Sequence, residues 1–158
     1  MVTEERMLRS KYYEAKTHAQ FLRTSPAFLT AFPQNIDENI NAYVDSSPRN
    51  LTVTMSLDVE GRKTKFFFTR HTDASYTGET EYTLNLPTSH GDVKVPQLGG
   101  KLSLYGRDTK VHVVDYQVGD YSLLYSSAEV FTSFVPPYPR RTISVPFDSE
   151  LLIINQDL

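Results

Sequence analysis

Acid–base residue types gather in one short stretch of the sequence, at Asp108, His112 and Asp115. A catalytic acid and base must converge on the same reacting group. His112 and Asp115 are three positions apart on a predicted strand, so their side chains point to opposite faces. Asp108 lies beside Gly106 in a predicted turn, where its carboxylate can accept a bond from the amide two residues on. We therefore predict structural roles for all three.

A second group, in the sequence RHTD at residues 70–73, places His71 and Asp73 on the same face of a predicted strand. Two side chains do not complete a zinc site, and no third histidine or carboxylate has a suggestive spacing. The sequence contains no cysteine, which excludes thiolate ligands and disulfides. We predict no metal site and no cofactor. A small hydrolase that unites residues of the two groups through folding stays open as a minor alternative.

Other catalytic patterns are also missing from the sequence. There is no Gly-x-Ser-x-Gly motif and no cysteine nucleophile. Gly99 and Gly100 are adjacent and lead into a predicted strand, so no helix follows whose amides would bind a phosphate. We predict no catalytic residue in this chain.

The tyrosines offer a different kind of site, because an exposed ring can stack on a sugar. We single out Tyr76, Tyr105 and Tyr116 as possible sugar-stacking residues, although sandwich strands also use tyrosine for packing. Further candidates of the same kind are Tyr82, Tyr121 and Tyr125. Asn50, followed by Leu51 and Thr52, has the form of an N-glycosylation acceptor, which matters only in the secretory pathway.

The first part of the chain has a helical pattern. Apolar side chains recur at spacings of three and four on one face, at Tyr12, Ala15, Ala19 and Leu22. Ser10 is a candidate N-cap, because its hydroxyl can accept a bond from a free amide of the first turn. Ser25 precedes Pro26, which disfavours helical backbone at that position, so we expect the helix to end there. Residues 25–50 have little periodicity and are predicted to be a largely irregular connector.

The rest of the chain alternates as strands do. An apolar face (Leu51, Val53, Met55, Leu57 and Val59) alternates with a polar one, and Glu60 and Gly61 then turn the chain into residues 63–71 as a hairpin. Further strands are predicted at 80–86, 92–95, 101–105, 109–117 and 121–126, each bounded by a turn with glycine. We predict a mainly β fold, an antiparallel β-sandwich with one short N-terminal helix.

Composition and charge narrow the possible partners. The 158 residues fit one domain, and ten tyrosines and nine phenylalanines supply much of a core. The net charge of −3 and the scattered basic residues argue against nucleic acid as a partner. No window is apolar enough to span a bilayer, so no membrane partner is expected. The N-terminal sequence MVTEERMLRSKYYE lacks the apolar region of a secretory signal, which makes a cytoplasmic location the default expectation.

A long series of motifs resembles the second domain of the fungal β-galactosidases of glycoside hydrolase family 35. The motifs are FTRHTDAS at residues 68–75, LNLPTS at 84–89, VPQLGGKLSLYGRDTKVHVVDY at 95–116 and LLYSSAEVFT at 123–132. Residues 3–31 resemble the helix that leads from the family's catalytic barrel into that domain. The resemblance implies a linker helix at residues 1–24, a domain 2-like sandwich at 25–132 and a divergent tail at 133–158.

The resemblance also implies where the chemistry of the family is done. Such enzymes hydrolyse terminal β-galactosides with two glutamates of a (β/α)₈ barrel, and a barrel of that kind needs about 200 residues or more. No glutamate of this chain matches those motifs. We therefore expect a non-catalytic domain or truncated fragment, inactive alone, whose partner is a family 35 barrel or another β-galactosidase domain. The alternative is a stand-alone carbohydrate-binding sandwich.

The tail does not resemble the family, which continues with further strands. If those strands are missing, a strand near residues 121–131 becomes a sheet edge that is either unpaired or covered by the tail. The apolar run LLII at residues 151–154 is the candidate cover, or else an aggregation hazard.

Overall fold

The computed structural model describes residues 6–34, 43–44, 50–60, 63–119, 121–130, 132–134, 142–144 and 150–155. These residues form two helices, α1 (Ser10–Thr24) and α2 (Pro26–Leu29), and a set of strands. The strands are β1 (Ala31–Gln34), β2 (Leu51–Asp58), β3 (Lys65–His71), β4 (Glu79–Tyr82), β5 (Leu84–Thr88), β6 (Gly91–Val95), β7 (Leu102–Tyr105), β8 (Thr109–Val118), β9 (Tyr121–Ser126), β10 (Thr132–Phe134), β11 (Thr142–Ser144) and β12 (Leu151–Asn155).

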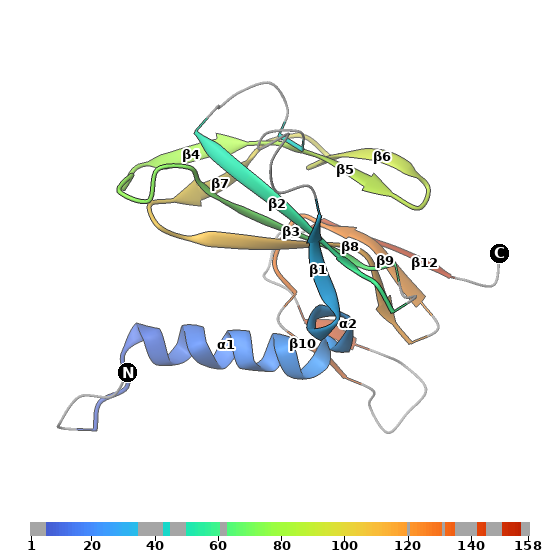
Figure 1. Ribbon diagram of the computed structural model, residues 1–158, viewed down its shortest axis with the longest axis horizontal. Coiled ribbons are helices and arrows are strands. Elements are labelled where there is room, and N and C mark those ends of the chain that lie inside the picture. Colours follow the sequence, from blue (N-terminus) through green and yellow to red (C-terminus); the bar gives the residue numbers. More distant parts are fainter. Residues whose placement is uncertain are drawn as a thin grey trace.

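Six strands form the main sheet in the order β1-β2-β3-β8-β9-β12, and every neighbouring pair is antiparallel. Two further two-stranded sheets, β4–β7 and β5–β6, are called ribbons below. They lie over one face of the main sheet, while α1 and α2 lie on the other side (Figure 1). The predicted fold class, a mainly β antiparallel sandwich with a short N-terminal helix, is confirmed.

The middle of the main sheet is buried on both faces. Successive side chains of a strand alternate between faces. Phe67 of β3 therefore packs in the core beneath the ribbons, and its neighbour Phe66 packs toward the helices. Val114 and Val113 of β8 divide in the same way. This two-sided burial explains the uninterrupted apolar run at the centre of β3.

The larger core lies between the main sheet and the ribbons. Its buried members come from both layers: Val44, Leu51, Val53, Phe67, Tyr82, Leu84, Leu86, Val95, Leu104, Val114 and Tyr125. Each large apolar side chain contributes roughly 1.5–3 kcal/mol when fully buried. This core holds the two layers together.

The second core joins the helices to the opposite face of the sheet. Phe28 of α2 meets Phe66 edge to face at a ring-centroid distance of 5.1 Å, and Phe21 of α1 meets Phe28 at 5.5 Å. The hydroxyl of Tyr116 hydrogen-bonds Ser25 Oγ at 2.6 Å and donates to the carbonyl of Thr24 at 3.3 Å. The junction between the two helices is thereby fixed to β8.

The structure corrects three expectations about the elements. Ser10 is already the first helical residue, and the N-cap is Arg9, which makes no side-chain capping bond. The predicted connector at 25–50 contains α2 and the edge strand β1. The predicted strand at 80–86 is interrupted at Thr83, so its halves, β4 and β5, belong to different ribbons. The end of α1 at Thr24 is confirmed, and the turn residue Gly61 lies outside the described residues.

The C-terminal segment completes the main sheet. β12 pairs with β9 antiparallel, with a register irregularity between Leu152 and Ile153. The apolar run at residues 151–154 is thus the cover for the edge that the sequence predicts. β10 and β11 pair with each other in a separate two-stranded sheet.

Candidate functional site: a groove between the first helix and the sheet

A groove of about 670 Å³ lies between α1 and the face of the sheet formed by β3 and β8. Its lining comes from segments far apart in the sequence: Glu14, His18, Phe21, Leu22, Phe28, Phe68, Arg107, Asp108, Thr109, Lys110, Val111 and Glu129. Its size falls in the range of ligand-binding clefts, roughly 300–1,000 Å³. We take this groove as the candidate functional site.

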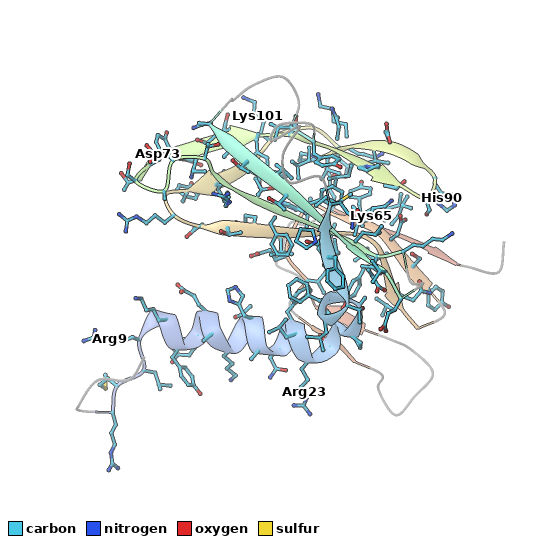
Figure 2. All side chains as sticks on the ribbon, viewed as in Figure 1. Arg9, Arg23, Lys65, Asp73, His90 and Lys101 are labelled. Atoms are coloured by element: carbon cyan, nitrogen blue, oxygen red, sulfur yellow. The ribbon has the colours of Figure 1, made fainter. Side chains whose placement is uncertain are left out.

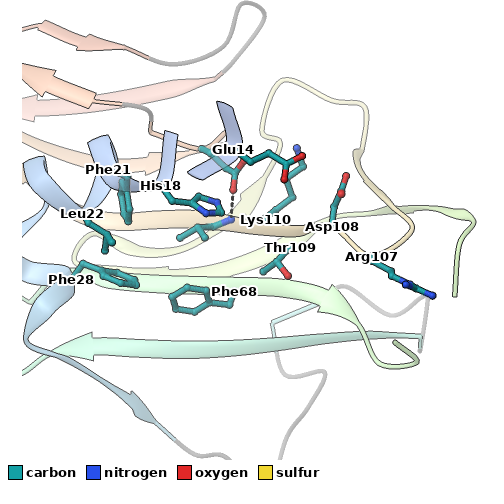
Figure 3. A pocket seen from close by; sticks show the side chains of 12 residues that line it. Glu14, His18, Phe21, Leu22, Phe28, Phe68, Arg107, Asp108, Thr109 and Lys110 are labelled. Carbon is teal, nitrogen blue, oxygen red and sulfur yellow. Dashed lines mark hydrogen bonds between the residues drawn. The ribbon is translucent and has the colours of Figure 1, made fainter. Parts of the chain in front are cut away.

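One end of the groove is apolar and the other is charged (Figure 3). Phe21, Leu22, Phe28 and Phe68 gather at the apolar end. The helix α1 borders the groove without closing it, since none of its described side chains is buried and Leu22 is 38% exposed. Arg23, in the last turn, points away from the sheet (Figure 2).

The charged end carries both signs. Glu14, Asp108 and Glu129 contribute carboxylates, and Arg107 and Lys110 contribute cations. The ion pairs found among the described residues, Lys65–Asp115 and Lys101–Glu81, lie elsewhere. Glu129 accepts a hydrogen bond from the amide of Val111 at 3.0 Å, drawn as the dashed line in Figure 3. That bond holds the segment after β9 against β8.

The first sequence cluster is separated by the fold. Asp108 is exposed at the groove, in a turn closed by its amide, which donates to the carbonyl of Tyr105 at 2.9 Å. His112 is buried beside the hydroxyl of Tyr82, which lies 3.2 Å from Nε2. Burial lowers the pKa of His112 to about 4, and the charge of Lys110 acts in the same direction. A neutral, enclosed imidazole of this kind is a core residue.

Asp115 binds a neighbouring element rather than a histidine. Its carboxylate accepts bonds from Lys65 Nζ at 3.2 Å and from the amide and hydroxyl of Ser89 at 3.1 and 2.7 Å. Lys65 also donates to the carbonyl of Pro87 at 2.6 Å. These bonds fix the β5–β6 ribbon to the main sheet.

His71 and Asp73 do not share a strand face as expected, because β3 ends at His71 and Asp73 lies in the bend that follows. Nδ1 of His71 donates to the carbonyl of Gly106 at 2.6 Å, because a carbonyl only accepts, and Nε2 faces the hydroxyl of Thr80 at 3.0 Å. Asp73 is exposed at the tip of the sandwich (Figure 2) and accepts bonds from the amide and hydroxyl of Ser75. The hydrogen bonds to Ser75 lower the pKa of Asp73. The pair forms no site.

The tyrosine candidates divide by exposure. Tyr116 is 2% exposed, so its ring faces are closed to a sugar, and Tyr82 and Tyr125 are buried as well. Tyr76 and Tyr105 are exposed at one end of the β4–β7 ribbon. Tyr76 lies against the ring of His71 at a centroid distance of 4.6 Å. The Tyr105 hydroxyl bonds to Glu79, and this bond together with the carboxylate's charge raises the pKa of Tyr105.

Asn50 stays a predicted glycosylation acceptor, but its side chain is engaged in the fold. Its Nδ2, the atom that would carry a glycan, donates to Thr80 Oγ1 at 3.0 Å, and Oδ1 is buried. Thr80 in turn bonds to His71. A glycan on Asn50 would replace one of the two hydrogens of Nδ2 and would have to fit beside the bond to Thr80.

The described residues offer neither a metal site nor a membrane-spanning helix. No group of three or more histidines and carboxylates in that part of the chain is placed to hold a metal ion. Neither described helix has the length and apolar character needed to cross a bilayer.

Taken together, the two layers, the antiparallel pairing and the helix-bordered groove define a β-sandwich domain with an attached N-terminal helix. The chain belongs to the family described as beta-galactosidase, domain 2, whose family model matches residues 34–135. The resemblance found in the sequence motifs is thereby confirmed.

Fungal relatives extend this match. The chain is 47% identical over 132 residues to probable beta-galactosidase E of Aspergillus fumigatus, and 48% identical over 133 residues to beta-galactosidase A of Aspergillus niger. In both comparisons 83% of this chain is aligned. The aligned part spans only 13% and 12% of the two relatives, so this chain corresponds to a small part of each.

Sequence reasoning missed most of the groove. Glu14, His18, Lys110 and Glu129 carry no shared motif, and they meet only because α1 and the segment after β9 lie over β8. Asp108, predicted to have a structural role in a turn, lies in a turn and also lines the charged end of the groove. A local pattern could not have brought these residues together.

Proposed function

We propose that this chain is a non-catalytic domain of a β-galactosidase that docks on the remainder of such an enzyme through α1 and the groove beside it. The family match and the shares of 12–13% supply the reason to look for a partner, because the relatives extend far beyond the aligned part. Hydrolysis of β-galactosides belongs, on this proposal, to that partner.

The observation that carries the proposal is the exposure of α1. A helix of 15 residues is marginal in water and normally gains its stability by packing one face. Here every described side chain of α1 is exposed or only partly covered, and Tyr13 and Leu22 are 56% and 38% exposed. A protein surface that covers α1 would bury these side chains and stabilise the helix.

The groove gives that partner surface its chemistry. Its apolar end suits an aromatic or aliphatic side chain, and its charged end suits polar groups of either sign. Interfaces within one polypeptide combine features of this kind. We therefore expect the partner surface to present an apolar side chain flanked by charged ones.

A chimaera tests the docking. Residues 6–135 would replace the aligned segment of A. niger beta-galactosidase A, and activity on a chromogenic galactoside and thermal stability would be recorded. We expect an active, cooperatively unfolding chimaera, while the intact chain alone shows no turnover. Turnover by the intact chain alone would overturn the assignment as non-catalytic.

A matched pair of substitutions locates the surface. Leu22→Glu places a charge in the groove, whereas Ala19→Glu places the same charge on an exposed position of α1 that does not line it. We expect Leu22→Glu to lower the chimaera's Tm and activity and Ala19→Glu to change neither, with both harmless in the intact chain. Equal effects of the two in the chimaera would contradict docking through the groove.

Carbohydrate binding is the second candidate, and Tyr76 and Tyr105 are the observation that favours it. Both rings are exposed near Glu79, whose carbonyl accepts a bond from Tyr76 and whose carboxylate bonds Tyr105. Since a ligand that binds only the folded state raises the Tm, an increase with galactose that disappears in Tyr105→Ala would support it. An unshifted transition would leave docking as the function.

A further inference from the structure

The C-terminal segment presents a carboxylate to two successive main-chain amides. The amide of Gln97 donates to Glu150 Oε2 at 2.7 Å, and the amide of Leu98 donates to Oε1 at 2.9 Å. Successive amides that point to one place form a concave site for an anion. Gly99 and Gly100 follow with φ of 99° and 83°, a backbone conformation that glycine adopts without strain. The loop is therefore shaped to hold a carboxylate.

The main chain beside this carboxylate is held as well. The amide of Glu150 donates to Ser127 Oγ at 2.8 Å, and the amide of Ser127 donates to the carbonyl of Glu150 at 3.0 Å. Directly afterwards β12 pairs with β9, with Leu152 opposite Tyr125. The Tyr125 hydroxyl donates to Gln97 Oε1 at 3.0 Å and so ties the amide-bearing loop to β9. The Gln97–Leu98 loop thus binds a carboxylate, and the adjoining edge of β9 pairs with the strand that follows it.

The family model matches one side of this contact and not the other. Gln97, Leu98, Ser127 and β9 lie inside the matched region, residues 34–135. Glu150 and β12 lie outside it. The acceptor surface therefore lies within the part of the chain that the family model matches, and its occupant lies outside that part.

We propose that the β9 edge with the Gln97–Leu98 amide pair is a peptide-binding site for an extended segment with a carboxylate immediately before an apolar strand. Residues 150–155 are a tethered example of that ligand, which the same sequence can replace in trans. Main-chain pairing supplies affinity in such strand addition, and side-chain contacts supply specificity. The proposal is independent of the groove at α1.

The exposure of the contact permits exchange. Gln97 and Leu98 are exposed, and Leu98 is 90% exposed, so the carboxylate-binding loop is open to solvent. Tethering gives the resident segment an effective concentration on the order of millimolar, which masks a competing peptide. The resident segment must therefore be weakened before a peptide in trans is seen.

The test uses the full chain and a fluorescent peptide of sequence SELLIIN, with SQLLIIN as its matched control. Fluorescence anisotropy would be measured with the wild-type chain and with Glu150→Gln, in which the tethered ligand has lost its carboxylate. We expect SELLIIN to bind Glu150→Gln about tenfold or more tightly than it binds the wild-type chain, and SQLLIIN to bind at least tenfold more weakly than SELLIIN. Glu81→Gln, which removes an exposed carboxylate elsewhere, should behave as wild type.

A chain in which a disulfide locks β12 onto β9 provides the complementary experiment. Ser122 and Ile154 are paired across β9 and β12, so Ser122→Cys with Ile154→Cys can form a disulfide in a protein that has no other cysteine. Introduced together with Glu150→Gln, this pair should abolish peptide binding when oxidised and restore it when reduced. Equal binding of the two peptides, binding by the locked chain, or no binding to a folded Glu150→Gln chain would each overturn the proposal.

A measurement on the wild-type chain covers the case in which Glu150→Gln does not fold. SELLIIN at concentrations well above the effective concentration of the tethered segment should lower the hydrogen-exchange protection of the amides in β12 and leave β3 and β8 unchanged. Unchanged protection of β12 would show that the segment is a fixed part of the sheet and would overturn exchange in trans.

Discussion

At the scale of single residues, buried polar side chains connect elements instead of forming a catalytic site. Asp115 has a φ of 52°, a left-handed conformation that aspartate and asparagine tolerate better than most residues. Its carboxylate joins Lys65 of β3 to Ser89 of the β5–β6 ribbon. His71 similarly joins the end of β3 to Gly106 and Thr80. The polar residues that resemble catalytic groups in the sequence thus connect the two layers of the sandwich.

Asp115 provides the first prediction. Asp115→Ala should lower the free energy of unfolding by about 3 kcal/mol, because it leaves the largely buried ammonium of Lys65 without its carboxylate. Asp115→Asn should cost less, because it keeps the left-handed tolerance and acceptor oxygen. Urea unfolding would measure both. Glu81→Ala is the control, since its ion pair with Lys101 is exposed and should not change stability measurably; equal losses in the two alanine variants would refute the assigned role.

His112 predicts how stability depends on pH. Its pKa is about 4 in the folded chain and 6.5 for an ordinary histidine, so between these values the unfolded chain binds more protons. Neutral His112 therefore contributes fully to the free energy of unfolding above pH 6.5. This contribution falls as the pH decreases toward 4, and the total loss is about 3 kcal/mol. Unfolding free energies measured from pH 7 to 4 should show a shallower fall in His112→Gln. An identical slope in the two proteins would be incompatible with a neutral buried His112.

At the scale of elements, the sheet is covered differently on its two faces. The ribbons close one face with a continuous apolar core, and the helices cover the other mainly around Phe28 and Tyr116. The bonds from Tyr116 to Ser25 and Thr24 are the polar part of this attachment. The orientation of α1, and with it the groove, therefore depends on this junction together with the contact between α1 and β10.

Tyr116→Phe tests the junction. Removing the hydroxyl leaves Ser25 buried without this partner, so we expect a loss of about 1–2 kcal/mol in the free energy of unfolding. Chemical denaturation followed by circular dichroism would measure it. Tyr121→Phe, at a 47% exposed position, should have almost no effect. A neutral Tyr116→Phe would mean that apolar packing alone fixes the helices.

At the scale of the whole molecule, stability should be unevenly distributed. β3 and β8 lie at the centre of the main sheet and are buried on both faces, whereas no described side chain of α1 is buried. Segments with few buried contacts open locally without global unfolding. We therefore expect α1, which borders the surface proposed for docking, to open more readily than the central strands.

Hydrogen exchange should display this gradient. Amides of residues 14–20 in α1 should exchange at least tenfold faster than those of β3 and β8, because opening the helix exposes little additional apolar surface. In the active chimaera the same amides should become protected. Equal protection of α1 and β8 in the isolated chain would contradict the uneven distribution, and unchanged exchange in the chimaera would contradict docking.

The elements show which expectations could be made from sequence. The sequence predicts β2 closely from its alternating pattern, and β6 to β9 from the glycine-bearing turns around them. Both signals depend only on neighbouring residues. The division at Thr83 was not predicted, because the continuous strand pattern of 80–86 does not reveal that β4 and β5 pair with different partners. Ser10 was a reasonable N-cap by residue type, but the helix begins one residue too early for it to serve.

The sequence by itself determined the strand-rich class, the end of α1 at Ser25 and Pro26, and the family, because periodicity, turn residues and ordered motifs are local properties of the chain. Only the tertiary structure decided that Tyr116 is buried, that Asp115 meets Lys65 and Ser89, and that Glu150 meets the amides of Gln97 and Leu98. The groove and the strand-binding edge likewise join segments distant in sequence. Such contacts arise from the packing of whole elements, which no short window of sequence contains.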